Sequence, residues 1–398
     1  MHWAFFETFI QSGTLAVIAP NGELRDFGKG NPNAAIEFSD PGCLAEILRN
    51  PEMNLGKTYV EGRWKPAAGS DLHSVLHVLR VNFEKTLAQT RWSALSQSVI
   101  AFLRSWNSLI ASRRNVAHHY DLDETLFRAC LDHDMHYSCA YYRRADESLE
   151  QAQQAKCRHI ARKLCLSPGQ RLLDIGCGWG SLALYLAEHH EVFVTGLTLS
   201  VEQLKVAEQR AMDTGLSHLV NFQLQDYRQH EKRYDRVVSV GMFEHVGKAA
   251  YRKFFACVER ALATEGIALI HTIANQQRAG AVNPWIRQHI FPGGHIPSAG
   301  QVVPAIEQSR LAIADLECWR GHYALTLAEW NRRFQDDRSQ FARTRGEAFC
   351  RMWEFYLVLC QTAFEVGHLA VHHWQLFKGD QTEIPVTRDY LHADGGKS

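Results

Sequence analysis

Three glycines and an aspartate form the pattern in this chain that points most clearly to ligand binding. Gly176, Gly178 and Gly180 alternate with larger residues just after Asp174. The apolar run before them predicts a buried strand over 171–175, and the apolar residues after them predict a helix. The glycines therefore lie on a strand-to-helix turn, where the absence of side chains lets a ligand approach the backbone closely. These residues alone leave open a tight turn that binds nothing.

The spacing of the glycines also bears on the kind of ligand. A nicotinamide site needs the longer pattern GxGxxG and an acidic residue at the end of the second strand. The second predicted strand, 192–196, leads into Leu197–Ser200 and carries no carboxylate there. Asp174 followed by GxGxG instead resembles the first motif of the class I S-adenosylmethionine (SAM) methyltransferases. That resemblance implies an α/β fold with a Rossmann-like sheet and helices on both faces.

The elements around the turn agree with such a sheet. Strands are predicted at the following five places, with helical segments between them: 171–175, 192–196, 219–224, 235–240 and 266–273. This alternation predicts a parallel sheet covered on both faces. Ligands bind such sheets at the carboxyl ends of the strands, where the following residues are expected to gather: Gly176, Thr198, Asp226, Glu244 and His271.

The chain is long enough for two domains, which we predict at 1–115 and 116–398. The first is a small N-terminal α/β accessory domain with a helical linker. It contains a hairpin around Asn21–Gly22, a short helix from Asp40 through Leu48, and a helical pattern over 71–115. The second is the SAM-dependent catalytic domain. Its apolar stretch 349–377 is interrupted by charges and predicts one or two core helices rather than a membrane span.

Composition excludes several classes of partner. Lys plus Arg and Asp plus Glu are equal at 43 each, so no global field attracts nucleic acid, and none is expected as a partner. Glu7 interrupts the aromatic amino terminus and no basic region precedes it, so the protein is expected in the cytoplasm. The ten cysteines lack CxxC pairs, which predicts reduced thiols and no zinc site. His368 and His372, predicted on one helical face, are interpreted as structural, so no metal is expected.

Several further stretches share one resemblance. They are His119–Leu122, Tyr137–Tyr141, Leu197–Ser200, Leu224–Arg228, Ser239–Gly247, His271–Ile273, Pro284–Ile286, Ile290–Gly293 and Tyr323–Trp330. Together with 174–180 they closely resemble the cyclopropane-fatty-acyl-phospholipid synthases and the related mycolic acid methyltransferases. The resemblance covers about residues 116–378, and the amino-terminal part is similar in general pattern to the accessory domain of the longer synthases.

The resemblance implies an enzyme that uses SAM as a methyl donor. In that family the methyl group is transferred to a cis double bond of a phospholipid acyl chain, and loss of a proton then closes a cyclopropane ring. An alkene is a weak nucleophile, so alignment with the methyl group matters and can remove roughly 7 to 11 kcal/mol of barrier. Aromatic faces suit the carbocation because they stabilise a desolvated positive charge by about 2 kcal/mol.

The resemblance further implies a bound bicarbonate that takes the proton. Its predicted ligands are Cys139, Glu244, His271, Tyr323 and the backbone of Ile273. Histidine, tyrosine and backbone N–H groups can donate to the bicarbonate oxygens, and a glutamate can accept from its hydroxyl. Without the resemblance, the alternatives are a small buried cysteine, an exposed glutamate in a turn and a histidine satisfied in the core.

The SAM site carried over from the family contains twelve residues: Tyr137, Ser138, Asp174, Gly176, Gly178, Gly180, Thr198, Leu199, Ser200, Gln203, Asp226 and Tyr227. Ser200 and Gln203 have an alternative role as a helix N-cap and its capping-box partner, and the two roles are compatible.

The resemblance also implies a phospholipid bilayer as partner, a peripheral location at the inner face of the membrane, and a homodimer. Three alternatives remain open. A close relative makes a methyl or methylene branch from the same carbocation. A soluble methyltransferase would act on nitrogen or oxygen of a small molecule, and a lipid-binding protein would carry a vestigial site.

Overall fold

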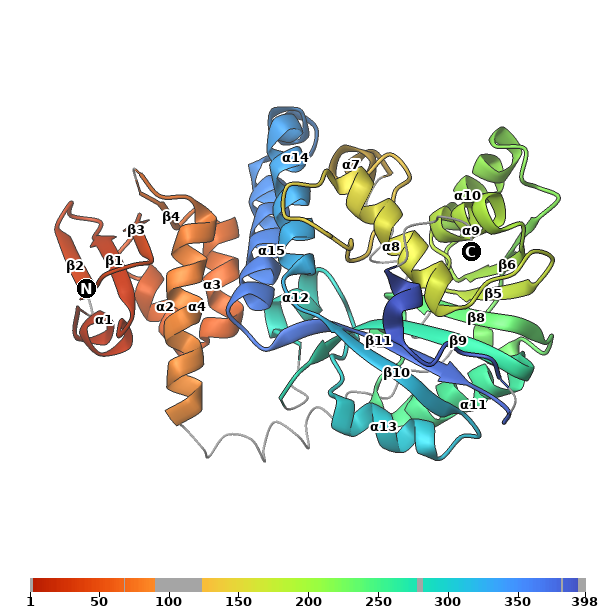
Figure 1. Cartoon of the computed structure of the whole chain (residues 1–398). Coiled ribbons are helices and arrows are strands. Elements are labelled where there is room, and N and C mark those ends of the chain that lie inside the picture. The colour runs from red at the N-terminus through yellow and green to blue at the C-terminus, as the bar shows by residue number, and fades with distance from the viewer. Residues whose placement is uncertain (1–2, 68, 90–123, 278–281, 381, 393–398) are drawn as a thin grey trace. The chain divides into compact units, whose positions relative to one another are not determined.

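The computed structural model describes residues 3–67, 69–89, 124–277, 282–380 and 382–392 (Figure 1). The chain forms two compact units. The first combines Met1–Ala101, Ala281–Pro292 and Tyr323–Leu369, and the second combines Phe102–Gly280, Gly293–His322 and Ala370–Ser398. The predicted boundary at 115 lies outside the described residues, as does most of the predicted helical linker. Two segments that we predicted within the catalytic domain, 281–292 and 323–369, group with the amino-terminal unit.

The first unit is an α/β unit. Its four-stranded sheet has the order β2-β1-β3-β4 and contains β1 (Gly13–Ile18), β2 (Leu24–Lys29), β3 (Asn33–Phe38) and β4 (Trp64–Pro66). Strands β1 and β2 are antiparallel, which confirms the predicted hairpin. The helices of this unit are α1 (Trp3–Phe9), α2 (Cys43–Arg49), α3 (Pro51–Val60), α4 (Leu72–Gln89), α12 (Pro284–His289), α14 (His322–Arg345) and α15 (Glu347–Glu365).

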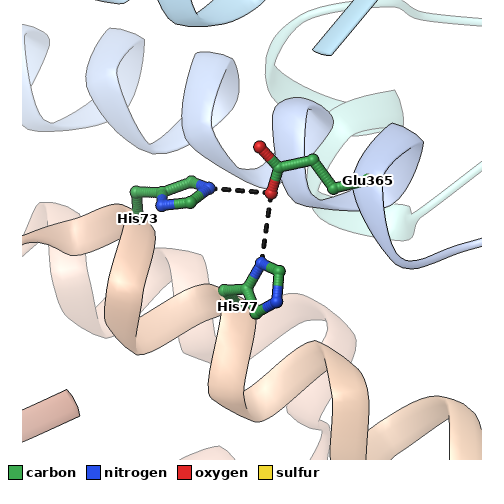
Figure 2. Close-up of side chains that lie close together, drawn as sticks. All are labelled: His73, His77 and Glu365. Atoms are coloured by element: carbon green, nitrogen blue, oxygen red, sulfur yellow. Dashed lines mark hydrogen bonds and ion pairs between the residues drawn. The ribbon is translucent and has the colours of Figure 1, made fainter. Parts of the chain in front are cut away.

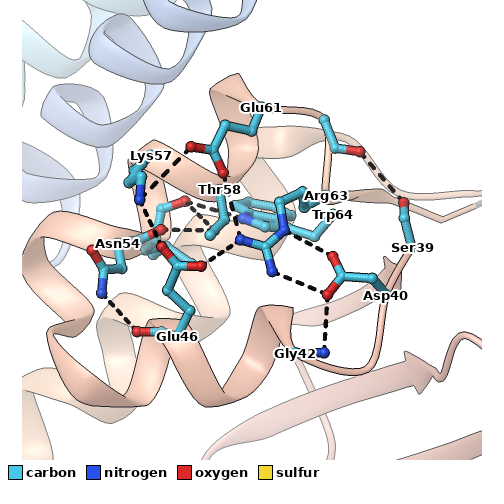
Figure 3. Close-up of polar contacts among 12 residues, drawn as sticks. Ser39, Asp40, Gly42, Glu46, Asn54, Lys57, Thr58, Glu61, Arg63 and Trp64 are labelled. Atoms are coloured by element: carbon cyan, nitrogen blue, oxygen red, sulfur yellow. Dashed lines mark hydrogen bonds and ion pairs between the residues drawn. The ribbon is translucent and has the colours of Figure 1, made fainter.

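A network of charged side chains connects α2 and α3 with Arg63, the residue before β4 (Figure 3). Arg63 donates to both carboxylate oxygens of Asp40, at 2.8 and 3.0 Å, and also to Glu46. Lys57 adds a bond of 2.8 Å to Glu46 and lies 3.8 Å from Glu61. The hydrogen bond from Arg63 is the main reason that the pKa of Asp40 lies below its ordinary value. The carboxylate of Asp40 also accepts from the backbone N–H of Gly42 at 2.9 Å and so fixes the turn before α2. Asp40 is not the predicted N-cap of that helix, which begins at Cys43 with Gly42 before it.

The second unit contains a seven-stranded sheet with the order β10-β11-β9-β8-β5-β6-β7 (Figure 1). The strands are β5 (Arg171–Ile175), β6 (Phe193–Thr198), β7 (Val220–Leu224), β8 (Tyr234–Val240), β9 (Leu262–Asn275), β10 (Ala312–Trp319) and β11 (Leu369–Phe377). Neighbours within β9-β8-β5-β6-β7 are parallel, which confirms the five predicted strands and their arrangement. Strand β10 runs antiparallel to β11.

Helices of the second unit are α7 (Glu124–Cys130), α8 (Leu149–Lys163), α9 (Ser181–His190), α10 (Val201–Asp213), α11 (Tyr251–Ala261) and α13 (Ala299–Glu307). Short 3-10 turns are η1 (Tyr227–Gln229), η2 (Phe243–His245), η3 (Lys248–Ala250) and η4 (Arg388–Leu391). Among the described parts of the chain, no helix combines the length and apolar character needed to cross a membrane.

Two apolar cores lie on opposite faces of this sheet. Consecutive strand residues alternate between them, because successive side chains of a strand point to opposite faces. Leu173 and Val237 belong to one core with α11 and α13, whereas Leu172 and Val238 belong to the other with α8 and α9. The predicted coverage of both faces is confirmed, and the buried strands hold the loops at their carboxyl ends in place.

The prediction of one or two helices over 349–377 is wrong at its carboxyl end. Helix α15 stops at Glu365, and 369–377 form strand β11. Every residue from Ala370 to Leu376 is buried, so the run lacks the alternation of a half-buried strand and cannot be told from a buried helix by periodicity. His372 therefore lies on a strand and shares no helical face with His368.

Candidate functional site

A pocket in the second unit lies beside the carboxyl ends of β5, β6, β7 and β8. It is lined by residues that follow each strand, including Gly176, Thr198, Asp226 and Gly241, and by the segment 135–138. Except for Gly180 and Ser200, all residues predicted to bind SAM line this pocket. Glu244 and His271, which we expected beside them, do not belong to the lining.

The three glycines of the turn adopt a backbone conformation that favours glycine. Gly176, Gly178 and Gly180 all have positive φ angles, of 86°, 56° and 80°. A Cβ atom at Gly176 would lie 2.9 Å from Met242, and one at Gly180 would lie 2.6 Å from Phe222. A Cβ atom at Gly178 would meet no protein atom within 4 Å. Gly176 and Gly180 are thus required by the fold, whereas Gly178 leaves open space in the pocket.

The turn after β6 leaves a hydrogen-bond donor for a ligand. Ser200 caps α10, because its Oγ accepts from the backbone N–H of Gln203 at 3.2 Å. The side chain of Gln203 accepts from the Thr198 hydroxyl at 2.9 Å. The Nε2 atom of Gln203 is buried and has no hydrogen-bond partner among the described residues. Since Gln203 also lines the pocket, this amide is placed to donate to a polar ligand.

Buried charges flank the other side of the pocket. Burial raises the pKa of Asp174 to about 7, and the nearby Lys156 opposes that rise. Lys156 is itself buried, which lowers its pKa, and its Nζ donates to the Ser138 hydroxyl at 2.9 Å. The sequence patterns did not single out Lys156. The available signal was its place on the apolar face of α8, beside Ala152 and Ala155.

Asp226 is buried and makes a two-pronged ion pair with Arg228. Its Oδ1 accepts from Nε of Arg228 at 2.8 Å, and its Oδ2 accepts from Nη2 at 2.7 Å. Burial raises the pKa of the neighbouring Tyr227 hydroxyl. Asp226 and Arg228 both line the pocket, so their ion pair fixes the charged end of the loop that follows β7.

Glu244 and Ile273 lie together, as the resemblance implies. The backbone N–H of Ile273 donates to Oε1 of Glu244 at 2.6 Å. The other carboxylate oxygen, Oε2, is buried and has no hydrogen-bond partner among the described residues. Burial raises the pKa of this carboxyl group to about 7. Glu244 can therefore exchange a proton near neutrality, and Oε2 is open to one further polar partner.

His271 has a partner that the sequence did not indicate. Its Nδ1 lies 2.7 Å from Nε2 of His373 on β11, and the ring of His373 packs 3.8 Å from that of Trp319. Burial lowers the pKa of His271 to about 3, with a further contribution from Lys156, and burial also lowers the pKa of His373. Both imidazoles are neutral at pH 7, so one N–H joins them and fixes the tautomer of His271 relative to that of His373.

The last two predicted bicarbonate ligands lie in different units. Cys139 is fully buried in the second unit, where its Sγ contacts the carbonyl oxygen of Ala140 at 3.3 Å. Tyr323 begins the part of α14 that belongs to the first unit. There its ring packs 4.8 Å from Phe364 and 6.0 Å from Trp330. The described contacts thus join Glu244 with Ile273 directly.

Comparisons with known proteins agree with this geometry. A sequence profile of the mycolic acid cyclopropane synthetase family matches residues 107–374. The cyclopropane-fatty-acyl-phospholipid synthase of Escherichia coli K12 is 38% identical over 361 residues, covering 90% of this chain and 92% of its own length. A probable fatty acid methyltransferase of Pseudomonas putida is 37% identical and covers 94% of both chains.

Solved structures extend the comparison. The cyclopropane synthase MmaA2 from Mycobacterium tuberculosis superposes with a TM-score of 0.64 at 33% identity, covering 67% of this chain and 98% of its own. The mycolic acid cyclopropane synthase CmaA1 complexed with SAH and CTAB gives a TM-score of 0.64 at 32% identity, with coverages of 69% and 99%.

The parallel sheet, the glycine turn and the pocket at the strand ends define a class I SAM-dependent methyltransferase, and the chain is an enzyme of that class. More specifically, the chain belongs to the mycolic acid cyclopropane synthetase family.

Proposed function

We propose that this enzyme transfers the methyl group of SAM to a cis double bond in a phospholipid acyl chain and closes a cyclopropane ring. The observation that carries the proposal is the 38% identity to the E. coli cyclopropane-fatty-acyl-phospholipid synthase across nine-tenths of both chains. The reaction consumes the sulfonium and the alkene, and it yields SAH, the cyclopropane and one proton.

The pocket at the strand ends is the proposed SAM site. Ten of the twelve residues carried over from the family line it as its proposed ligands, and Gly180 and Ser200 lie in the turns that support it. When bound, SAM supplies an electrophilic methyl group. Gly178 leaves room for the ligand, and the buried Nε2 of Gln203 supplies a donor that lacks a partner among the described residues. Lys156 adds a buried positive charge on the side of Ser138, where a ligand carboxylate is the matching group.

Glu244, His271, Cys139, Tyr323 and Ile273 are proposed to hold a bicarbonate. When bound, this ion would supply the base for the proton that leaves. The open Oε2 of Glu244 fits an acceptor for its hydroxyl. The N–H of Ile273 already donates to Glu244, so it can donate to the ion only after that carboxylate turns. The neutral His271 donates or accepts according to the tautomer that His373 permits.

Three further parts of the proposal rest on family resemblance. The enzyme is placed at the inner face of the membrane as a peripheral protein, it forms a homodimer, and 1–115 serves as an accessory domain to a catalytic domain over 116–398. Flotation with vesicles and sedimentation analysis test the first two, and separate expression of 116–398 tests the third.

The test of the reaction uses the full chain, SAM with a labelled methyl group, and vesicles of phosphatidylethanolamine and phosphatidylglycerol with cis-monounsaturated chains. Vesicles with the same headgroups and saturated chains are the control. We expect label in the acyl chains of the unsaturated vesicles and none in the saturated ones. Label in a headgroup amine, or in neither lipid, would contradict the proposal and favour a different acceptor.

The bicarbonate site predicts a dependence on dissolved carbonate. Turnover should fall when carbon dioxide is stripped from the buffer and recover when bicarbonate is added. The control is SAM binding measured in the stripped buffer, which should not change. An equal rate with and without bicarbonate would remove the ion from the mechanism while leaving methyl transfer intact.

An acyl chain with a methyl or methylene branch is the second candidate, because two relatives are described as acid methyltransferases rather than as cyclopropane synthases. The tuberculostearic acid methyltransferase UfaA1 of M. tuberculosis is 34% identical and covers 88% of this chain, and the P. putida relative is described as a probable fatty acid methyltransferase. The same carbocation would then lose a different proton and give a branched alkene instead of a ring, so only the structure of the product separates the two.

A further inference from the structure

Three potential metal ligands converge between α4 and α15 in the first unit (Figure 2). His73 and His77 lie one turn apart on α4, and both point at the same oxygen of Glu365 on α15. Nε2 of His73 lies 2.7 Å from Oε2 of Glu365, and Nδ1 of His77 lies 3.1 Å from it. The three ligand atoms all lie within 4.8 Å of one another.

A hydrogen bond to its second oxygen holds the carboxylate of Glu365 in this orientation. Nε2 of Gln361, one turn earlier on α15, donates to the other oxygen of Glu365 at 2.8 Å. That bond leaves Oε2 facing the two imidazoles. A hydrogen bond to the outer oxygen of a ligating carboxylate is the usual support in metal sites, because it fixes the direction of the ligating oxygen.

The donor types and their exposure suit a transition metal with one open position. Two imidazole nitrogens and one carboxylate oxygen are the ligands of many Zn²⁺ sites that keep a water molecule as the fourth ligand. The side chains of His73, His77 and Glu365 are 34%, 27% and 24% exposed, so water and metal have access. Two histidines at positions i and i+4 of a helix are a known spacing for zinc.

A second group of similar composition does not meet these conditions. His159, Glu317 and His373 also bring three ligand atoms within 4.8 Å in the second unit. There the buried ammonium of Lys163 lies 2.8 Å from the same Glu317 oxygen that His159 contacts. A dication at that point would be repelled by Lys163, so this group is an internal ion-pair network.

We propose that His73, His77 and Glu365 form a binding site for a divalent transition metal, with Zn²⁺ as the fitting ion and water as the fourth ligand. The metal joins α4 to α15, so its effect is to stabilise the first unit rather than to take part in methyl transfer. Sequence spacing gives little sign of this site, because its third ligand lies 288 residues after His77.

The test is zinc content and thermal unfolding of the untagged full chain. After equilibration with ZnCl2 and dialysis, we expect about one bound zinc per chain, and a higher Tm than in EDTA. The double substitution His73→Ala and His77→Ala should abolish both effects. His133→Ala is the control, since that histidine is 93% exposed and lies in the other unit, and it should keep both effects.

Two further measurements distinguish this site from zinc bound by cysteines or by other histidines of the chain. Glu365→Gln keeps the shape of the side chain, so it serves if the double variant does not fold; its zinc affinity should fall about tenfold or more. Co²⁺ in place of zinc should give visible d–d bands without the thiolate charge-transfer band of a cysteine site. Zinc retained equally by the double variant or by Glu365→Gln, thiolate bands with Co²⁺, or no bound zinc in the wild type would each overturn the proposal.

Discussion

Burial of the Glu244 carboxyl group lowers the free energy of unfolding when that group is ionised. Burial raises its pKa from an ordinary 4.5 to about 7. The folded state then holds the proton more tightly than the unfolded state, so the free energy of unfolding falls as pH rises from about 4.5 to about 7. The full cost above that range is about 3 kcal/mol, at about 1.4 kcal/mol for each unit of pKa.

The substitution Glu244→Gln tests this assignment. The amide removes the charge but keeps the shape and can still accept from Ile273. In bicarbonate-free buffer we expect the variant to be more stable than the wild type at about pH 8, with the difference disappearing toward about pH 5. Urea unfolding at the two pH values measures it, and an equal difference at both would contradict the buried-carboxylate account.

The same variant tests the catalytic assignment of Glu244. We expect it to lose most turnover while SAM affinity stays the same, because Glu244 does not line the SAM pocket. Turnover with labelled SAM and calorimetric SAM binding give the two readouts. Unchanged turnover would remove Glu244 from the mechanism.

A substitution at Gly178 tests the SAM site without disturbing the packing of other side chains. A Cβ atom there would meet no protein atom within 4 Å, so Gly178→Ala should weaken SAM binding by roughly tenfold or more through the ligand. Gly22→Ala is matched, since Gly22 also has a positive φ angle and open space but lies in the β1–β2 turn. It should show a similar loss of stability with unchanged SAM affinity. Equal SAM affinity in both variants would place the ligand elsewhere.

Site residues could be predicted from the sequence where they belong to a motif of closely spaced residues. Asp174 and the glycines form a local pattern, so the turn could be found from sequence, and the pocket gathers the residues that follow each strand. Lys156 and His373 could not be found this way. Their partners, Ser138 and His271, are distant in sequence and meet them only through packing.

Among the helices, α3 depends on a glycine for its packing against α12 and α15. A Cβ atom at Gly56 would lie 2.6 Å from Phe355 and 2.8 Å from Trp285. Gly56→Ala should therefore destabilise the first unit by about 1–3 kcal/mol, although alanine favours a helix.

Thermal unfolding measures this effect, and Gly300→Ala is the matched control. Gly300 lies in α13 with its nearest neighbour 4.0 Å from the added atom, so that substitution should be neutral or slightly stabilising. If both substitutions stabilise the protein equally, the close approach of α3 to α12 and α15 is wrong.

Strands were predicted correctly where they alternate with helices along the chain, and strands β10 and β11 outside that alternation were missed. α-Helices separate the strands from β5 to β9 except between β7 and β8, where only the short turn η1 intervenes, and this largely regular alternation of strand and helix makes the strands recognisable. Strand β10 escaped prediction, and β11 was taken for part of a helix because it is buried along almost its whole length. Burial on both faces removes the period that distinguishes a strand.

For the whole chain, the hardest feature to predict is the discontinuity of the two units. Segments 281–292 and 323–369 lie within the catalytic part of the sequence but belong to the same compact unit as the amino-terminal residues. Their patterns show that apolar faces are buried, but not against which part of the chain. The side-chain contacts of α15 with α3 and α4, such as the hydrogen bond of 3.1 Å that the Tyr59 hydroxyl donates to Glu354, carry that information.

Formation of a cyclopropane ring from the methyl group of SAM is the reaction that we propose for this chain. The most direct measurement is mass spectrometry of acyl chains after reaction of cis-unsaturated vesicles with SAM carrying a fully deuterated methyl group. Ring closure removes one deuteron, so we expect the gain of one methylene unit with two deuterium atoms, and a product that resists mild hydrogenation. Retention of all three deuterium atoms, or a product that takes up hydrogen as an alkene, would contradict the claim and identify a branching methyltransferase.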